Sequence, residues 1–226
     1  MMPFPPLSKL FALLLASALT GCVAPPPAYD YSAFRQSNPT SIVVLPPVNT
    51  SPDVKATYSM LAQVTHPLAE AGYYVLPVAL VDETFKQNGL INPEDMHQAP
   101  PAKLHEIFGA DAALYIEVSQ YGSSYKVLVS EVAVAANAKL VDLRSGQLLW
   151  EGSAFASTAE NQNNSGGGLI GMLITAAVNQ IVNTLSERGH QVAGITSQRL
   201  LSPGGNRGIL PGPRSPLHQQ NHLAAQ

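Results

Sequence analysis

The chain has 226 residues, a formal net charge of −3, one cysteine and 12% charged residues; the charged share is about half that of an average soluble domain. A hydrophobic content of 46% can form a core. The absence of a basic excess argues against nucleic-acid binding. A single cysteine excludes an intramolecular disulfide and a zinc site made of several thiolates.

The first 22 residues predict where the protein goes. An apolar stretch from Leu10 to Leu19 follows the single charge of Lys9. It is shorter than the roughly 20 apolar residues that cross a bilayer, and it fits a secretory signal sequence. Residues 19–22, Leu-Thr-Gly-Cys, resemble the lipobox of bacterial lipoproteins. The resemblance implies cleavage after Gly21 and lipid on Cys22; the alternative is an ordinary signal peptide with a chance cysteine.

The residue that follows the lipobox bears on the membrane of destination. It is Val23 and not the aspartate that, in the lipoprotein pattern, marks retention in the inner membrane. We therefore expect an outer-membrane anchor with the domain in the periplasm, or alternatively at the cell surface. Residues 1–21 are expected to form the signal peptide, 22–40 the lipidated cysteine and a Pro-rich tether, 41–200 an α/β domain, and 201–226 a largely disordered Pro/Gly-rich tail. An extended tether from Cys22 to Ser41 would reach about 60 Å.

The first half of the domain alternates strands and helices. A β-branched run ending at Pro46 predicts a buried strand. Ser51 and Pro52 predict a helix start, and Pro67 predicts a kink or a split in that helix. In chain order we expect a strand at 41–45, a helix at 51–71, a strand at 73–78, helices at 79–88 and 100–108 with a turn at 92–95 between them, and a strand at 111–120.

After an expected turn at 122–124 the hydrophobic period changes to two. It predicts antiparallel strands at 126–142 and 147–155, joined by a hairpin turn at 142–146. One face of the first strand is apolar and holds Leu128, Val132, Val134, Ala136, Ala138 and Leu140. The other face includes Glu131, Asn137 and Lys139. The order of elements predicts an α/β fold: a single domain with a mixed sheet and helices packed mainly on one face.

The segment 169–185 predicts a helix with an unusually wide apolar face, because its polar stripe consists of Thr175, Asn179 and Asn183. The face either packs on the sheet and under loops or contacts a second copy or another protein. Amide side chains disfavour a membrane span. The candidate contact residues are Leu169, Ile170, Leu173, Ile174, Ala177 and Ile181.

The sequence shows no catalytic or metal-binding pattern. Gly166–Gly168 precede a helix but lack the Lys-Ser/Thr pair of a phosphate-binding loop. The six histidines do not have the spacing of two ligands on one ordered helix, and no G-x-S-x-G elbow occurs. We therefore expect no enzymatic activity, no catalytic residue, no metal and no cofactor apart from covalent lipid on Cys22.

Four segments carry a family resemblance: 45–58, 72–78, 101–116 and 139–146. They resemble an uncharacterised family of proteobacterial lipoproteins that includes a meningococcal vaccine-candidate antigen, over about Tyr29 to Pro216. More distantly, Leu-Pro-Pro at 45–47, Phe-Gly-Ala-Asp at 108–111 and the hairpin turn are similar to the TolB N-terminal domain and to the core of the curli secretion lipoprotein CsgG. The resemblance implies a TolB-like fold and a binding or assembly module with no catalytic residues.

These observations predict a non-enzymatic outer-membrane lipoprotein that forms a homo-oligomer and supports an envelope transport or secretion complex. The candidate partners are CsgG-like envelope lipoproteins, and no nucleic acid is expected. A pore is not expected, because only 126–155 approaches a long alternating hairpin. The alternatives are a periplasmic carrier of lipid or another small ligand, with segment 169–185 lining its pocket, or an envelope hydrolase testable at His66 and His105.

Overall fold

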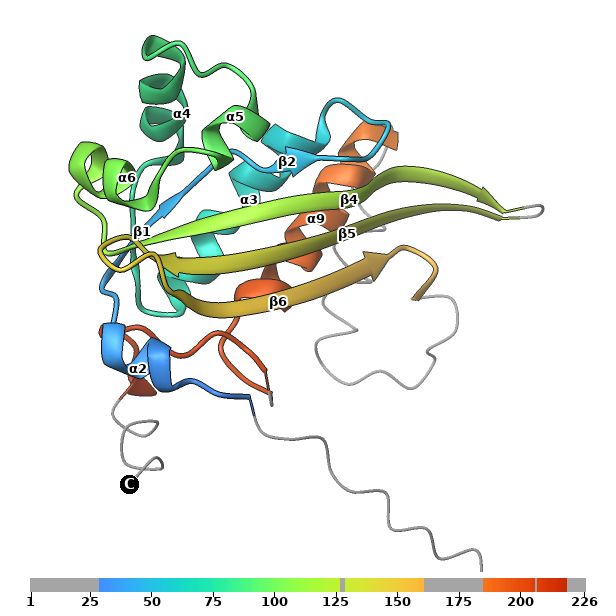
Figure 1. Ribbon diagram of the computed structural model, residues 1–226. Coiled ribbons are helices and arrows are strands. Elements are labelled where there is room, and N and C mark those ends of the chain that lie inside the picture. Colours follow the sequence, from blue (N-terminus) through green and yellow to red (C-terminus); the bar gives the residue numbers. More distant parts are fainter. Residues whose placement is uncertain (1–28, 127–128, 161–184, 206, 219–226) are drawn as a thin grey trace, which may run out of the picture.

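The computed structural model describes residues 29–126, 129–160, 185–205 and 207–218 (Figure 1). The predicted signal peptide and Cys22 lie outside the described residues. So does the predicted helix at 169–185, apart from its last residue.

A mixed six-stranded sheet forms the centre of the domain, in the order β3-β1-β4-β5-β6, with β2 beside β4. β1 pairs in parallel with β3 and β4, whereas β4, β5 and β6 are antiparallel neighbours. The strands are β1 (Ser41–Val44), β2 (Val48–Asn49), β3 (Tyr74–Val75), β4 (Ala112–Lys126), β5 (Val129–Asp142) and β6 (Leu148–Ser157). The expected α/β class with a mixed sheet is confirmed.

The two longest helices, α3 (Ala56–Glu70) and α9 (Leu185–Leu201), share the main core with one face of the sheet. On the other face, three short helices cover the region of β1 and the start of β4: α4 (Val78–Gln87), α5 (Pro93–His97) and α6 (Pro101–Phe108). A further short helix, α2 (Ser32–Ser37), lies at the opposite end of the molecule from α4 and α6 (Figure 1). Helices therefore cover both faces of the sheet, with the two long helices on one face and the three short helices over part of the other.

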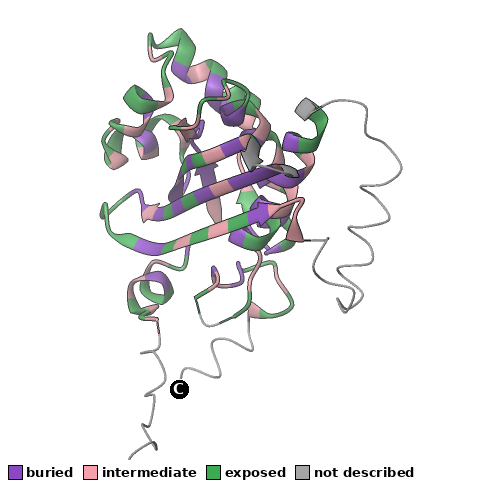
Figure 2. Ribbon diagram, turned by 90° about the vertical axis from the view of Figure 1, so that its right-hand side faces the viewer, coloured by how far each residue is buried: buried purple, intermediate pink, exposed green. Residues whose placement is uncertain are grey.

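Alternating side chains of the long strands build the main core, and Figure 2 shows this alternation of buried and exposed positions along β4, β5 and β6. The predicted apolar face of β5 is confirmed over its described side chains. Its members Val132, Val134, Ala136, Ala138 and Leu140 are all at most 2% exposed. Of the side chains between them, Asn137 and Lys139 are exposed, whereas Ala133 is buried.

Helix α3 begins later than expected. The Ser51 hydroxyl donates to Asn49 Oδ1 (2.6 Å) and does not cap a helix, and the Lys55 N–H bonds to Asp53 Oδ1 (2.9 Å) in a turn that precedes Ala56. Val54, expected on the apolar face, is consequently 86% exposed. The predicted split at Pro67 is also wrong: the helix continues to Glu70, because a proline in the last turn interrupts few hydrogen bonds and this one is buried.

Several other boundaries differ from the prediction. The strand at 73–78 is reduced to the two residues of β3, and the turn at 92–95 is part of α5. β4 does not turn at Gly122 but runs on to Lys126, after a bulge between Val118 and Gln120. The hairpin of β4 and β5 is therefore longer than the 126–155 hairpin that the sequence suggests.

Helix α9 is the largest element that the sequence prediction misses. It holds Val192, Ala193, Leu200 and Leu201 in the main core. Two internal glycines conceal it, since glycine is a poor helix former. Both glycines allow close packing: a Cβ on Gly189 would lie 2.9 Å from the Tyr121 ring, and one on Gly194 would lie 3.1 Å from Gln63 Oε1.

The described part of the tail packs against the domain. Ile209 is 1% exposed, and the carbonyls of Arg207, Gly208 and Leu210 accept hydrogen bonds from side chains of the domain and of the N-terminal segment. These donors are Trp150 Nε1, Tyr31 Oη and Tyr73 Oη. The expected disorder of 201–226 therefore does not hold for residues 207–218, and 219–226 lie outside the described residues.

Part of the expected tether also belongs to the folded domain. Phe34 is buried, Tyr29 Oη accepts a hydrogen bond from the Glu151 N–H (3.0 Å), and Ser37 Oγ donates to Asp142 Oδ2 (2.6 Å). The structure thus shortens the part of the chain that can act as a tether to residues 22–28, and the expected reach of about 60 Å is wrong.

Candidate functional site

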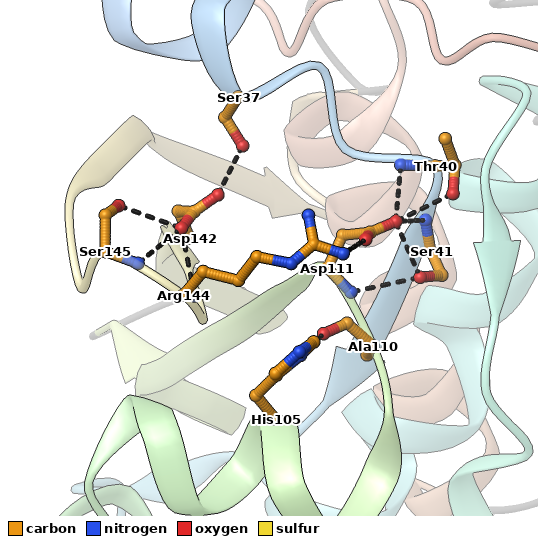
Figure 3. Close-up of polar contacts among 9 residues, drawn as sticks. All are labelled: Ser37, Thr40, Ser41, His105, Ala110, Asp111, Asp142, Arg144 and Ser145. Atoms are coloured by element: carbon orange, nitrogen blue, oxygen red, sulfur yellow. Dashed lines mark hydrogen bonds and ion pairs between the residues drawn. The ribbon is translucent and has the colours of Figure 1, made fainter.

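Two carboxylates form the densest polar cluster of the described residues, at the end of the sheet where β1 and β4 begin and β5 ends (Figure 3). Asp111 Oδ2 accepts hydrogen bonds from the N–H and hydroxyl of both Thr40 and Ser41, and Asp111 Oδ1 pairs with Arg144 Nη2 at 2.9 Å. Asp142 accepts from Ser37, from Ser145 and from the Arg144 N–H.

The electrostatics of the cluster indicate a structural role. Burial by itself would raise the pKa of Asp111, but the hydrogen bonds from Thr40 and Ser41 lower it to about 2. Burial would likewise raise the pKa of Asp142. The hydrogen bonds that Ser37, Ser145 and Arg144 donate have the larger effect, so the pKa of Asp142 is lowered. Both carboxylates are held ionised and surrounded by donors, so neither can serve as a general base near neutral pH. The cluster fastens β1 to the hairpin turn.

The two histidines proposed as candidate hydrolase residues lie on different helices and do not form a common site. His105 Nδ1 lies 2.8 Å from the carbonyl oxygen of Ala110 and so donates to the backbone (Figure 3). His66 is exposed on α3. Within the residues that the structure describes, no group of three or more His, Cys, Asp or Glu side chains could hold a metal ion.

The face of the sheet opposite α3 and α9 is left open over β5 and β6 by the described helices. We call this surface the open face, and its side chains are Tyr115, Glu117, Asn137, Lys139, Glu151 and Ser153. They stand in two cross-strand rows, since Lys139 lies opposite both Tyr115 and Glu151, and Asn137 lies opposite both Glu117 and Ser153. The rows place a lysine between an aromatic ring and a carboxylate.

A cavity of about 690 Å³ extends from the open face to the outer edge of β6. Glu151, Gly152 and Ser153 line it from the strand, and Tyr29, Arg199 and Arg207 line it from the neighbouring segments. Its volume lies within the range of ligand-binding cavities. Its charged lining fits a polar chain better than a lipid tail.

A second cavity of about 360 Å³ continues across the open face and shares Glu117, Asn137 and Lys139 with the first. His97 and Tyr115 close its far end, with ring centroids 5.3 Å apart in an edge-to-face contact. Burial lowers the pKa of His97, and burial raises that of Tyr115, so both rings are neutral at pH 7. His97 Nε2 donates to the Pro46 carbonyl at 2.9 Å.

The sequence analysis locates only part of this surface. It assigns Asn137 and Lys139 to the outer face of their strand, and the structure confirms that position. It misses the cavity at the edge of β6, because the cavity depends on where Tyr29, Arg199 and Arg207 lie. The remaining predicted site residues fall outside the described residues. They are Gly21, Cys22, Leu169, Ile170, Leu173, Ile174, Ala177 and Ile181.

Among the described helices, none combines the length and the apolar character needed to cross a bilayer. A family model described as "Putative lipoprotein GNA1162-like" matches residues 29–214. The chain belongs to this GNA1162-like family. The resemblance drawn from the sequence is thereby confirmed, over nearly the same residues.

Three comparisons place the chain within known proteins. It is 52% identical over 206 residues to the Putative lipoprotein NMB1124/NMB1162 of Neisseria meningitidis serogroup B (strain ATCC BAA-335 / MC58), covering 91% of this chain and 95% of that one. It is 55% identical to the crystal structure of lipoprotein GNA1162 from Neisseria meningitidis, with a TM-score of 0.51, over 65% of this chain and all of the other. A PelC dodecamer from Paraburkholderia phytofirmans matches at 13% identity and a TM-score of 0.40, over 78% and 91%.

Proposed function

We propose that the protein is a non-enzymatic outer-membrane lipoprotein whose domain acts in the periplasm as a binding and assembly module of an envelope transport or secretion complex. Membership of a lipoprotein family supports the anchored location. The partner is a second copy of this chain or a neighbouring envelope lipoprotein.

The observation that carries the proposal is the edge of β6 beside the larger cavity. The Glu151 N–H bonds to Tyr29 Oη and not to β5. Because backbone groups alternate along an antiparallel strand, the Ser153 N–H points away from β5 as well. Ser153 lines the cavity. An outward-pointing strand edge beside a cavity is the geometry by which a partner adds an extended segment through main-chain hydrogen bonds.

The proposal is tested by a photo-crosslinking amino acid at position 153 in the full-length protein in its native envelope, with Gln87 on α4 as the control position. We expect adducts of defined size at position 153 that are absent at 87. Adducts of equal yield at both positions, or none at 153, would contradict the proposal.

A matched pair of substitutions separates the main chain from the side chain. Ser153→Pro removes the outward N–H at an edge position where proline is tolerated, whereas Ser153→Ala removes only the hydroxyl. For this pair the crosslinker is placed at the neighbouring exposed Phe155. We expect the adduct to disappear with Ser153→Pro and to persist with Ser153→Ala, with thermal unfolding confirming that both variants are folded.

A further inference from the structure

Arginines gather at one end of the domain. No acidic residue occurs between 188 and 226. Arg207 and Arg214 of this segment are exposed, and the described tail (residues 207–218) runs beside α2, which carries Arg35 (Figure 1). Arg35 lies 5.7 Å from the centre of the Tyr31 ring, and the charges of Arg35 and Arg207 both act on Tyr31. We call Arg35, Arg207 and Arg214 the basic end; Asp30, Asp142 and Glu151 are acidic side chains near it.

The opposite end of the molecule has the opposite charge. The segment 78–108, which forms α4, α5 and α6, carries five acidic side chains and two lysines, a formal charge of −3. In Figure 1, α4 and α6 lie above the strands and α2 lies below them, at the same end of the sheet, where β4 begins. The domain is therefore electrostatically polarised along the line that joins these two ends.

The predicted anchor leaves the domain at the basic end. Tyr29 is fixed there through its hydroxyl contact with Glu151. The seven steps from Cys22 to Tyr29 span at most about 25 Å even when fully extended. A compact domain of this size is about 40 Å across, so a tether of that length cannot bring the far end to the membrane.

We propose that the basic end is a membrane-docking surface that binds the headgroups of anionic phospholipids in the leaflet that holds the anchor. The inference rests on lipidation of Cys22 and goes beyond the proposed function, since it assigns a membrane face and not a partner. Exposed arginines near an anionic surface each add to binding, and the attraction falls off within a Debye length, which the short tether satisfies. The acidic end is repelled and projects away from the bilayer.

The test uses the full mature lipoprotein in vesicles of phosphatidylethanolamine, with or without phosphatidylglycerol. A donor dye is attached to a single added cysteine, at Gln36→Cys on α2 or at Gln87→Cys on α4, and an acceptor dye to a lipid headgroup. Both positions are exposed glutamines. We expect energy transfer from position 36 to exceed that from 87 at least twofold, and to increase when phosphatidylglycerol is included.

Variants in which glutamine replaces basic side chains distinguish docking of the basic end on the membrane from simple attachment through the lipid anchor. In Arg35→Gln/Arg207→Gln/Arg214→Gln, transfer from position 36 should lose its dependence on phosphatidylglycerol. Lys86→Gln/Lys103→Gln, on α4 and α6 at the opposite end, should keep it. About 0.5 M NaCl, where the Debye length is about 4 Å, should reproduce the triple variant in the unmodified chain, so the test does not depend on that variant folding. Transfer that is insensitive to phosphatidylglycerol, or higher from 87 than from 36, would overturn the proposal.

Discussion

The Tyr121 ring of β4 lies directly against Gly189 of α9, where a Cβ atom would be only 2.9 Å from the ring. Tyr121 cannot easily move away, since it is 6% exposed and its hydroxyl donates to Ser59 Oγ at 2.7 Å. The contact exists because the bulge before Gln120 places Tyr121 on the core face of β4. One glycine therefore fixes how closely α9 approaches the sheet.

Replacing that glycine should destabilise the domain. Gly189→Ala forces a methyl group into the Tyr121 ring, and overpacking of this kind typically costs about 1–3 kcal/mol, only partly offset by a gain of about 1 kcal/mol in helix propensity. We expect a net loss of up to about 2 kcal/mol in the free energy of unfolding, measured by urea denaturation. Gly194→Ala is the matched control, because it meets only the flexible end of Gln63 at 3.1 Å. It should be neutral or slightly stabilising; equal losses in both variants would contradict the close-packing account.

The Asp111 cluster should make stability depend on pH in the acid range. The pKa of Asp111 is about 2 in the folded chain against 3.8 for the ordinary group. A lowered pKa stabilises the fold fully above about pH 4, and this contribution is lost as the pH falls towards 2. Asp111→Asn should therefore lower the free energy of unfolding by about 1 kcal/mol at pH 7, allowing for solvent screening. The difference from the unsubstituted chain should shrink between pH 4 and pH 2, and a constant difference would refute this assignment.

Packing of the tail predicts that one residue near its centre is important for stability. Ile209 is 1% exposed in the main core, so Ile209→Ala should cost about 2–4 kcal/mol in the free energy of unfolding. Leu217→Ala serves as the control because Leu217 is 49% exposed. Thermal unfolding and limited proteolysis after Arg207 check both variants. No loss in Ile209→Ala would mean that the tail is detached from the domain.

The tail also depends on a glycine outside it. Gly72 has a φ of +94°, and a Cβ there would lie 2.3 Å from the backbone nitrogen of Ser215. Its carbonyl accepts the Arg214 N–H at 3.1 Å. Gly72→Ala should therefore release residues 212–215 and accelerate hydrogen exchange at the Arg214 amide at least tenfold, as measured by mass spectrometry. Unchanged exchange at that amide would show that the tail does not need this approach.

The hydrophobic periodicity of the sequence was sufficient to predict the sheet, but not helix α9 or the tail that packs against the domain. The β-branched run at 41–44 predicts a buried strand, and the alternation from Val132 to Leu140 predicts which side of a strand is buried; both predictions are confirmed. Helix α9 was not predicted because its glycines lower the helix propensity of the segment. The close contacts that require these glycines are visible only in the folded chain. The packing of the tail was not predicted because it depends on hydrogen bonds from tyrosine and tryptophan side chains to backbone carbonyls. Such bonds produce no hydrophobic periodicity in the sequence.

The same limit applies to the candidate site. The polar side of β5 was visible as Asn137 and Lys139 alternating with apolar residues, so the open face could be anticipated. The cavity beside β6 brings Tyr29 and Arg207 together from positions 178 residues apart, and no local pattern encodes that meeting. The Asp111–Arg144 pair is similar, since each residue reads in isolation as an ordinary surface charge.

The order in which the core is completed matters for a chain that is threaded through a membrane. Ile209 and the carbonyls around it finish a core that begins with Phe34, so the earliest and latest parts of the domain meet at one place. In a chain exported from its N-terminus through the predicted signal peptide, this core could be completed only after residues near 210 had crossed the membrane. The completed end would then lie next to the predicted point of attachment.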